Sequence, residues 1–308
     1  MKYLKLIRYQ NLLMLGFMQL IVRYGFLKQQ HIFLALTNFQ FILLVVSTLC
    51  IAAGGYIIND IFDVETDIEN RPKRVVVGTS ISEDIAYNLY FGFTVVGVLI
   101  GFYLSNAIGL NSFAGAFIIT AALLYLYANS LKQSLLIGNV IVALLLSFSV
   151  LIIALFDLLP VTYEGNRAEM GLIFTILLDY AIFAFIINFI REIVKDLEDI
   201  NGDYNQGMNT LPIAIGISRT TKIVFALGIV FILYLCYYIY QYYFLNHLII
   251  STLYSILFIV SPMIYCIIKI FEAKHQSEFK HLSNILKIIL CFGILSIAIT
   301  SYNIQHHV

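Results

Sequence analysis

Long apolar runs separated by short polar segments dominate the sequence. Runs such as VIVALLLSFSVLIIALF are apolar throughout, which favours membrane-spanning helices over the alternating strands of a membrane β-barrel. A run of about 20 residues is long enough to cross the hydrocarbon core of a bilayer. The pattern predicts about nine transmembrane helices, over residues 10–27, 38–59, 86–105, 112–128, 134–156, 170–190, 222–243, 248–271 and 284–302.

The composition agrees with this pattern. Of the 308 residues, 61% are hydrophobic and 12% are charged, whereas a soluble domain has about 45–50% apolar and roughly 25% charged residues. We therefore predict an all-α, polytopic membrane protein in which residues 1–308 form a single integral-membrane domain. Lys and Arg total 18 and balance the 18 Asp and Glu, so the basic surface that nucleic-acid binding requires is not expected.

The basic residues predict how the chain is oriented in the membrane. Alternation of the nine spans puts Arg23, Lys28 and Arg167 on one side, and Arg23 is expected to extend its guanidinium to the interface. Cytoplasmic loops carry the excess of basic residues, so the opposite side, with the N-terminus, is predicted to be cytoplasmic. The fifteen basic residues on that side are Lys2, Lys5, Arg8, Arg71, Lys73, Arg74, Lys132, Arg191, Lys195, Arg219, Lys222, Lys269, Lys274, Lys280 and Lys287.

Ten of the 18 carboxylates lie in two short segments, 60–69 and 192–203, each of which begins where an apolar run ends. Within each segment three aspartates have the spacing i, i+3 and i+7, which on a helix puts them on one face. The two segments therefore have equivalent positions and equivalent internal patterns. Their aspartates are Asp60, Asp63 and Asp67 in the first, and Asp196, Asp199 and Asp203 in the second.

Three like charges on one helix face repel one another unless cations lie between them. Carboxylate oxygens select a hard ion such as Mg²⁺, which commonly bridges carboxylates to a substrate phosphate. Basic residues beside each segment suit a site for Mg²⁺ and diphosphate, while the alternative is a pair of solvated, salt-bridged segments. These basic residues are Arg71, Lys73 and Arg74 next to the first segment, and Arg191 and Lys195 within the second.

Other polar residues near the predicted cytoplasmic face are further candidates. Lys132 is the only charged residue between Asp84 and Asp157, and it is either a site residue or a simple interfacial anchor. The same alternative holds for Arg8 and the adjacent Asn11. Asn139 lies inside an apolar run and needs a hydrogen-bond partner, which is either structural or a ligand.

Aromatic residues suggest how a positive charge could be shielded during a reaction. Most of the 21 Tyr and 24 Phe are typical of interfacial belts and of lipid-facing surfaces. Some of Tyr56, Phe62, Tyr125 and Tyr127 are placed to stabilise a carbocation by cation–π attraction.

The first acidic segment, NDIFDVETDIENRPKR at 59–74, resembles the NDxxDxxxD signature of the UbiA superfamily of intramembrane prenyltransferases. The second, in the segment 191–212, reads KDLEDINGD followed by GMNTLP and resembles the second aspartate-rich motif of that family. The YANSLK…GN stretch and the nine spans extend the resemblance over essentially the whole chain. Val75 departs from the pattern, because many members have a proline there.

The resemblance implies a Mg²⁺-dependent prenyltransferase that uses a polyprenyl diphosphate as donor. It implies that Mg²⁺ binds Asp60, Asp63, Asp67, Asp196, Asp199 and Asp203 through the diphosphate, and that Asn59 completes the first site. It also implies that Arg71, Arg74, Lys132 and Lys195 contact the diphosphate or an acceptor anion.

The stretch REIVKDLEDINGD most resembles the branch of the family that transfers geranylgeranyl to geranylgeranylglyceryl phosphate. That acceptor needs an extra cationic pocket, which Arg8, Lys73, Lys132 and Arg191 could supply. The rival acceptor is aromatic, as in quinone, haem or chlorophyll-type prenylation. Two other classes stay open: a cation or solute transporter, because acidic residues in membrane proteins often mark ion paths, and a scaffold that binds prenyl diphosphate without turnover.

Overall fold

The computed structural model describes residues 1–70, 72 and 75–306. The regular structure in these residues is helical apart from one isolated bridge between Val77 and Ile81, which confirms the predicted all-α architecture. Eight of the described helices are long and apolar enough to cross a membrane. They cover Asn38–Phe62, Glu83–Ala107, Asn111–Asn129, Ile137–Val161, Glu164–Asn205, Ile217–Phe244, Ile249–Glu272 and Gln276–Gln305.

The described residues form the following elements. The long α-helices are α3 (Asn38–Phe62), α5 (Glu83–Ala107), α6 (Ala114–Asn129), α7 (Ile137–Asp157), α8 (Arg167–Asn205), α10 (Ile217–Tyr238) and α13 (Gln276–Gln305). The shorter ones are α1 (Lys2–Leu6), α2 (Tyr9–Leu20), α4 (Val64–Asn70), α9 (Leu211–Ile215), α11 (Ile249–Ser255) and α12 (Ser261–Glu272). Short 3₁₀ or π segments are η1 (Ile21–Phe26), η2 (Leu27–Gln30), η4 (Asn111–Phe113), η5 (Leu131–Gln133), η6 (Leu159–Val161), η7 (Glu164–Asn166), η8 (Ile239–Phe244) and η9 (Ile256–Val260).

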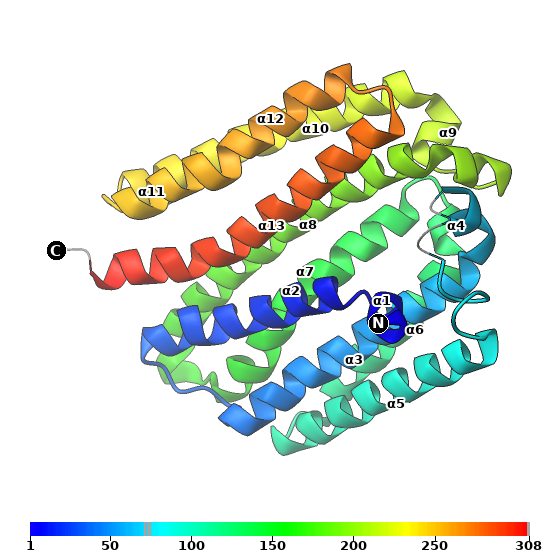
Figure 1. Cartoon of the computed structure of the whole chain (residues 1–308). Coiled ribbons are helices and arrows are strands. Elements are labelled where there is room, and N and C mark those ends of the chain that lie inside the picture. Colours follow the sequence, from blue (N-terminus) through cyan, green and yellow to red (C-terminus); the bar gives the residue numbers. More distant parts are fainter. Residues whose placement is uncertain (71, 73–74, 307–308) are drawn as a thin grey trace.

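The count of eight is close to the predicted nine, and the difference is the first predicted span, 10–27. Its helix, α2 continued by η1, lies beside α3 and α13 (Figure 1), and it contains polar and charged residues at Gln10, Asn11, Gln19 and Arg23. Gln19, for example, is fully buried and donates hydrogen bonds from its amide to Thr48 Oγ1 and to the Ser149 carbonyl, both at 3.2 Å. The amide of Gln19 therefore packs against protein.

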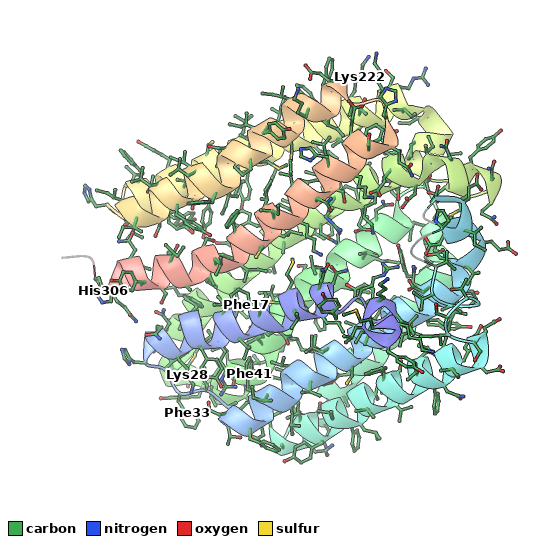
Figure 2. All side chains as sticks on the ribbon, viewed as in Figure 1. Phe17, Lys28, Phe33, Phe41, Lys222 and His306 are labelled. Carbon is green, nitrogen blue, oxygen red and sulfur yellow. The ribbon has the colours of Figure 1, made fainter. Side chains whose placement is uncertain are left out.

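The long helices lie side by side, and the short helices α4 and α9 lie together at one end of the bundle (Figure 1). This end, where α3 and α8 finish near Asp63 and Asp203, is called the polar end below. The last turns of α13 lie at the opposite, far end (Figure 1). Figure 2 shows Lys28 at the far end and Lys222 at the polar end, so these two lysines are separated as the alternation of spans predicts.

Helices α3 and α5 pack closely because α5 has a glycine at their contact. A Cβ on Gly97 would come within 2.6 Å of the Ile51 side chain and 3.0 Å of the Ser47 carbonyl oxygen. The Ser47 hydroxyl donates a hydrogen bond of 2.6 Å to the Gly97 carbonyl. Small residues that let helices approach in this way are typical of membrane bundles, where close contact replaces hydrophobic driving force.

A small cluster of buried apolar side chains packs against the end of α3 at the polar end. Leu6 of α1 packs with Ile57 and Ile61 near the end of α3, and all three are buried. Val77 and Ile81, from the segment after α4, complete the contact. The end of α3, which carries the first aspartates, is therefore fixed against two other segments.

At the far end, the expectation that Arg23 extends to the membrane interface is wrong. Its side chain is buried, and its guanidinium lies 3.1 Å from the Asp157 carboxylate and donates a 2.5 Å hydrogen bond to the Leu36 carbonyl. The Leu36 amide donates in turn to Asp157 at 3.1 Å. A charge that is buried this deeply needs a counter-charge, and Asp157 at the end of α7 supplies it. The ion pair and its hydrogen bonds therefore join three parts of the chain, which are η1, the segment that precedes α3, and α7.

We predict that Arg23→Met lowers the free energy of unfolding by about 3–5 kcal/mol, because it leaves the Asp157 carboxylate buried without its counter-charge. Thermal unfolding in detergent measures the change, and Arg167→Met, at an exposed site of the same end, is the control. The double variant Arg23→Met/Asp157→Leu should recover most of the loss. Equal melting temperatures for wild type and Arg23→Met would contradict the structural role of the pair.

Candidate active site

A cavity of about 910 Å³ extends from the polar end into the bundle. At the polar end its walls carry both aspartate segments, and deeper in the bundle its walls are mostly apolar. Such a cavity suits an elongated ligand with a charged head and an apolar tail. Representative apolar residues in its wall are Met18, Phe117, Ile152, Phe231 and Ile297.

The first aspartate segment lies where α3 passes into α4. Asp60 is in the last turn of α3, Asp63 is the residue between the two helices, and Asp67 is in α4. The backbone keeps helical hydrogen bonds through the junction, since the Asp63 amide donates to the Asn59 carbonyl at 2.9 Å and the Asp67 amide donates to the Asp63 carbonyl at 2.7 Å. All three aspartates therefore line the same cavity, as their spacing predicts.

Basic residues from elsewhere in the chain pair with these aspartates. The Arg8 guanidinium lies 2.6 Å from the Asp60 carboxylate, and the Lys132 ammonium forms an ion pair with Asp63. The Lys132 side chain is only 9% exposed, so it points into the site and does not act as a free interfacial anchor. Asn59 donates from its side-chain amide to the other Asp63 oxygen at 2.5 Å.

Arg8 is held in an uncommon backbone conformation. Its φ of 49° lies in the left-handed region that non-glycine residues seldom adopt, at the turn from α1 to α2. Burial lowers the pKa of its guanidinium, but the charge of the Asp60 carboxylate and its hydrogen bond, together with the nearby Tyr56 and Asp67, outweigh the burial, so the pKa is raised above its usual value. The guanidinium also lies over the Tyr56 ring, 5.2 Å from its centre, which keeps a full positive charge at the cavity wall.

The second aspartate segment lies on α8 itself, because this helix continues beyond its predicted apolar span to Asn205. Asp196, Asp199 and Asp203 all line the cavity, which agrees with their shared helix face. Asn139, from the start of α7, donates a 2.7 Å hydrogen bond to the Asp196 carboxylate.

Glu192, one turn before Asp196, binds two of the predicted cations. Lys195 donates to its carboxylate at 2.8 Å and Arg191 does so at 3.2 Å. Its side chain is only 6% exposed. Glu192 therefore positions both basic side chains at the cavity wall, a role that the sequence analysis did not assign.

Asn70 joins the two segments directly, and the sequence analysis missed it. Its side-chain amide donates to the Asp199 carbonyl at 3.0 Å, and its side-chain oxygen accepts from the Gly202 amide at 2.9 Å. Gly202 makes room for this contact, because a Cβ there would lie 2.4 Å from the Asn70 side chain. A second link runs from the Asn205 side chain to Glu69, so α4 and α8 are fixed against each other.

The two aspartate segments could hold metal ions only if the ions share their ligands with a substrate. Within the described residues, no group of three His, Cys, Asp or Glu side chains is close enough to hold a metal ion alone. Mg²⁺ typically takes only one or two carboxylates, with phosphate oxygens and water as its other ligands. Aspartates of two segments that line one cavity suit Mg²⁺ bound in this way, because carboxylate oxygens are the hard ligands that it prefers.

The structure brings together nearly all the predicted site residues that it describes. Those lining the cavity are Arg8, Asn11, Asn59, Asp60, Asp63, Asp67, Lys132, Arg191, Lys195, Asp196, Asp199 and Asp203. Asn139 lies behind Asp196 as its hydrogen-bond donor, and Arg71, Lys73 and Arg74 lie outside the described residues. The chemical roles of all these residues stay predictions.

Two of the four candidate aromatic residues contribute to the cavity. Tyr56 and Tyr127 line it. Phe62 and Tyr125 are exposed and pack against each other, with ring centres 6.0 Å apart. The position of Tyr56 and Tyr127 near the aspartates makes them the candidates for shielding a carbocation.

Comparison with known proteins finds one matching family model and several relatives in sequence. The model of the UbiA prenyltransferase family matches residues 24–292. A protein named digeranylgeranylglyceryl phosphate synthase, from Sulfolobus acidocaldarius, is 40% identical over 178 residues, which cover 58% of this chain and 58% of that protein. A protein of the same name from Sulfurisphaera tokodaii is 36% identical over 194 residues, covering 62% of this chain and 64% of that protein. The chain thus aligns with less than two thirds of the length of either relative.

The fold also has a solved counterpart. A structure described as a UbiA homolog from Archaeoglobus fulgidus bound to DMAPP and Mg²⁺ superposes with a TM-score of 0.57. The alignment covers 96% of this chain and 99% of that one, at 16% sequence identity. At this identity the likeness establishes a shared fold.

We predict that the contact between Asn70 and Gly202 couples the two aspartate segments. Asn70→Ala should lower the free energy of unfolding by about 1–3 kcal/mol, because it removes two hydrogen bonds between α4 and α8. Gly202→Ala should be destabilising in the native chain and much less so in the Asn70→Ala background, where the added methyl group has space. Thermal unfolding of the four proteins in detergent gives the coupling energy.

The control for this cycle is Gly171→Ala, on the same helix, where an added Cβ meets nothing within 4 Å. It should be neutral or slightly stabilising in both backgrounds. Additive effects of Asn70→Ala and Gly202→Ala would contradict the coupling.

Proposed function

Because the chain belongs to the UbiA prenyltransferase family, we propose that it transfers a prenyl group from a prenyl diphosphate to a membrane-bound acceptor in a Mg²⁺-dependent reaction. The whole chain acts as one catalytic domain in this proposal. The observation that carries it is the cavity that has both aspartate segments at its polar end and apolar walls beyond them.

The aspartates on α3, α4 and α8 would hold the Mg²⁺ ions together with the donor diphosphate. When bound, Mg²⁺ neutralises the negative charge that develops on the departing diphosphate. The residues proposed for this role are Asp60, Asp63, Asp67, Asp196, Asp199 and Asp203, which all line the cavity.

The basic side chains add to this neutralisation. Lys132 and Arg8 already contact aspartates of the first segment, and Lys195 lies beside the second. They place fixed positive charges around the leaving group, where the surrounding protein makes electrostatic stabilisation effective. Arg71 and Arg74 keep this proposed role from the sequence.

The reaction then follows from the two parts of the cavity. The bond between C1 of the prenyl chain and the diphosphate oxygen breaks, and the diphosphate keeps the electron pair. The acceptor oxygen attacks C1, and the proton of its hydroxyl group passes to the released diphosphate or to water. The apolar walls hold the prenyl chain and keep water from C1, while Tyr56 and Tyr127 face the developing positive charge.

For the acceptor we propose the hydroxyl group of a glyceryl phosphate lipid, with geranylgeranyl as the transferred group. This is supported by the two relatives named digeranylgeranylglyceryl phosphate synthase, at 40% and 36% identity. An aromatic acceptor is the alternative that the assay below distinguishes.

Incubation of the purified protein with geranylgeranyl diphosphate, Mg²⁺ and both acceptor types should give the ether-linked glyceryl phosphate product by mass spectrometry. Asp63→Asn and Asp199→Asn should each lower turnover roughly 100-fold, because each removes a carboxylate that is proposed to hold Mg²⁺ at the leaving diphosphate. Asp84→Asn, at an exposed position of α5 outside the cavity, should leave turnover unchanged.

Turnover without a divalent metal, or undiminished turnover in both aspartate variants, would contradict the mechanism. Product from the aromatic acceptor alone would assign the aromatic alternative. Metal flux into proteoliposomes without prenyl transfer would favour a transporter, and donor binding without any product would favour a scaffold.

We also propose that the polar end and the N-terminus face the cytoplasm, since fifteen of the 18 basic residues belong to this side in the predicted alternation. In a background with the four native cysteines replaced, Lys28→Cys should react with an impermeant thiol reagent in intact cells. Lys222→Cys should react only after the cells are permeabilised. The reverse pattern would overturn the orientation.

A further inference from the structure

A lysine that the proposed mechanism does not use lies in the wall of the same cavity. Lys287, on α13, lines the cavity and donates a 2.6 Å hydrogen bond from its ammonium group to the side-chain oxygen of Asn11 on α2. These two residues are 276 positions apart in the chain. The sequence alone therefore places Lys287 only among the basic residues of its membrane side.

A second cation approaches the same part of α13. Arg191 on α8 donates a 3.3 Å hydrogen bond from Nε to the carbonyl of Ser283, which is one helical turn before Lys287. Arg191 also lines the cavity. Helices α2, α8 and α13 thus each contribute a polar side chain to one wall, which we call the basic wall: Asn11, Arg191 and Lys287.

The charges on this wall differ from those around the aspartate segments. Arg8 and Lys132 are paired with Asp60 and Asp63, which belong to the proposed diphosphate site. The sequence of α2 contains no Asp or Glu, and that of α13 contains only Glu278, which is exposed. Glu192 contacts this wall through Arg191, and its carboxylate also pairs with Lys195.

This arrangement matters for an acceptor that carries its own phosphate. A phosphate monoester has up to two negative charges, and close to the aspartates it would be repelled by both the carboxylates and the donor diphosphate. It needs cations of its own on a separate wall of the cavity. An ammonium and a guanidinium beside a neutral amide supply the donors that a phosphate requires.

Resting on the proposed function, we propose that Lys287, with Arg191 and Asn11, binds the phosphate of the glyceryl phosphate acceptor. The acceptor head would lie between α2, α8 and α13, and its hydroxyl group would point toward the aspartate segments. The donor and acceptor anions would then occupy opposite sides of the reacting carbon.

The test compares Lys287→Met and Lys287→Arg in the full-length protein. Lys287→Met should raise the KM for the glyceryl phosphate acceptor at least about ten-fold, because it removes a charged hydrogen bond to phosphate. It should change the KM for geranylgeranyl diphosphate less than about two-fold. Lys287→Arg, which keeps the charge, should restore most of the acceptor affinity.

The matched control is Lys280→Met. Lys280 lies two helical turns earlier on α13, is exposed, and does not line the cavity. Its substitution should leave both KM values unchanged. Melting temperatures of all variants in detergent show whether any of them has lost its fold.

A direct titration separates this inference from the proposed function. A glyceryl phosphate bearing one short ether-linked chain is titrated into each protein in the presence of Mg²⁺ and inorganic diphosphate. The wild type should bind it, and Lys287→Met should bind it at least about ten-fold more weakly. If the probe binds in a way that depends on Lys287 but no prenyl transfer occurs, the result would support the phosphate site and refute the proposed function.

Three results would overturn the inference. The wild type fails to bind the glyceryl phosphate probe, or Lys287→Met binds it as tightly as the wild type does. Alternatively, Lys287→Met raises the KM of the donor as much as that of the acceptor, which would assign Lys287 to the diphosphate.

Discussion

Mutual repulsion among the aspartates of the two segments is the constraint on which the polar end depends. Carboxylates gathered on one cavity destabilise the fold unless each is offset by a cation or a hydrogen-bond donor. The structure offsets them with groups from other helices: Arg8 for Asp60, Lys132 for Asp63 and Asn139 for Asp196. The turn before α2 and the segment η5 are thereby joined to the end of α3, and α7 is joined to α8.

The same contacts prepare the site for a ligand. A basic group that balances a carboxylate before a metal–diphosphate complex arrives is already in place to neutralise that complex once it is bound. The amide contacts of Asn70 with α8 keep the two segments at a fixed separation. The stability of the polar end and its proposed chemistry therefore rest on the same side chains.

Local sequence patterns were sufficient to predict the helices and the aspartate triads. Apolar runs mark the spans, and the spacing of Asp196, Asp199 and Asp203 places them on one face of α8. The extension of α8 beyond residue 190 is not visible in hydropathy, because its last turns are polar. The ion pair of Arg23 with Asp157 and the hydrogen bond of Lys287 to Asn11 join residues that are far apart in the chain. A single sequence contains no information on which distant segments meet.

The length of α8 has a consequence for how lipid substrates would reach the site. Its 39 residues extend about 58 Å at 1.5 Å per residue, roughly twice the 30 Å thickness of the hydrocarbon core. One continuous helix therefore carries both residues of the apolar part of the cavity and the aspartates of the second segment. An amphiphile could enter and leave by diffusing in the plane of the bilayer, with its anionic group always at the aqueous surface. Under the proposed function, the search for both substrates would then take place in two dimensions, without the cost of extracting a lipid into water.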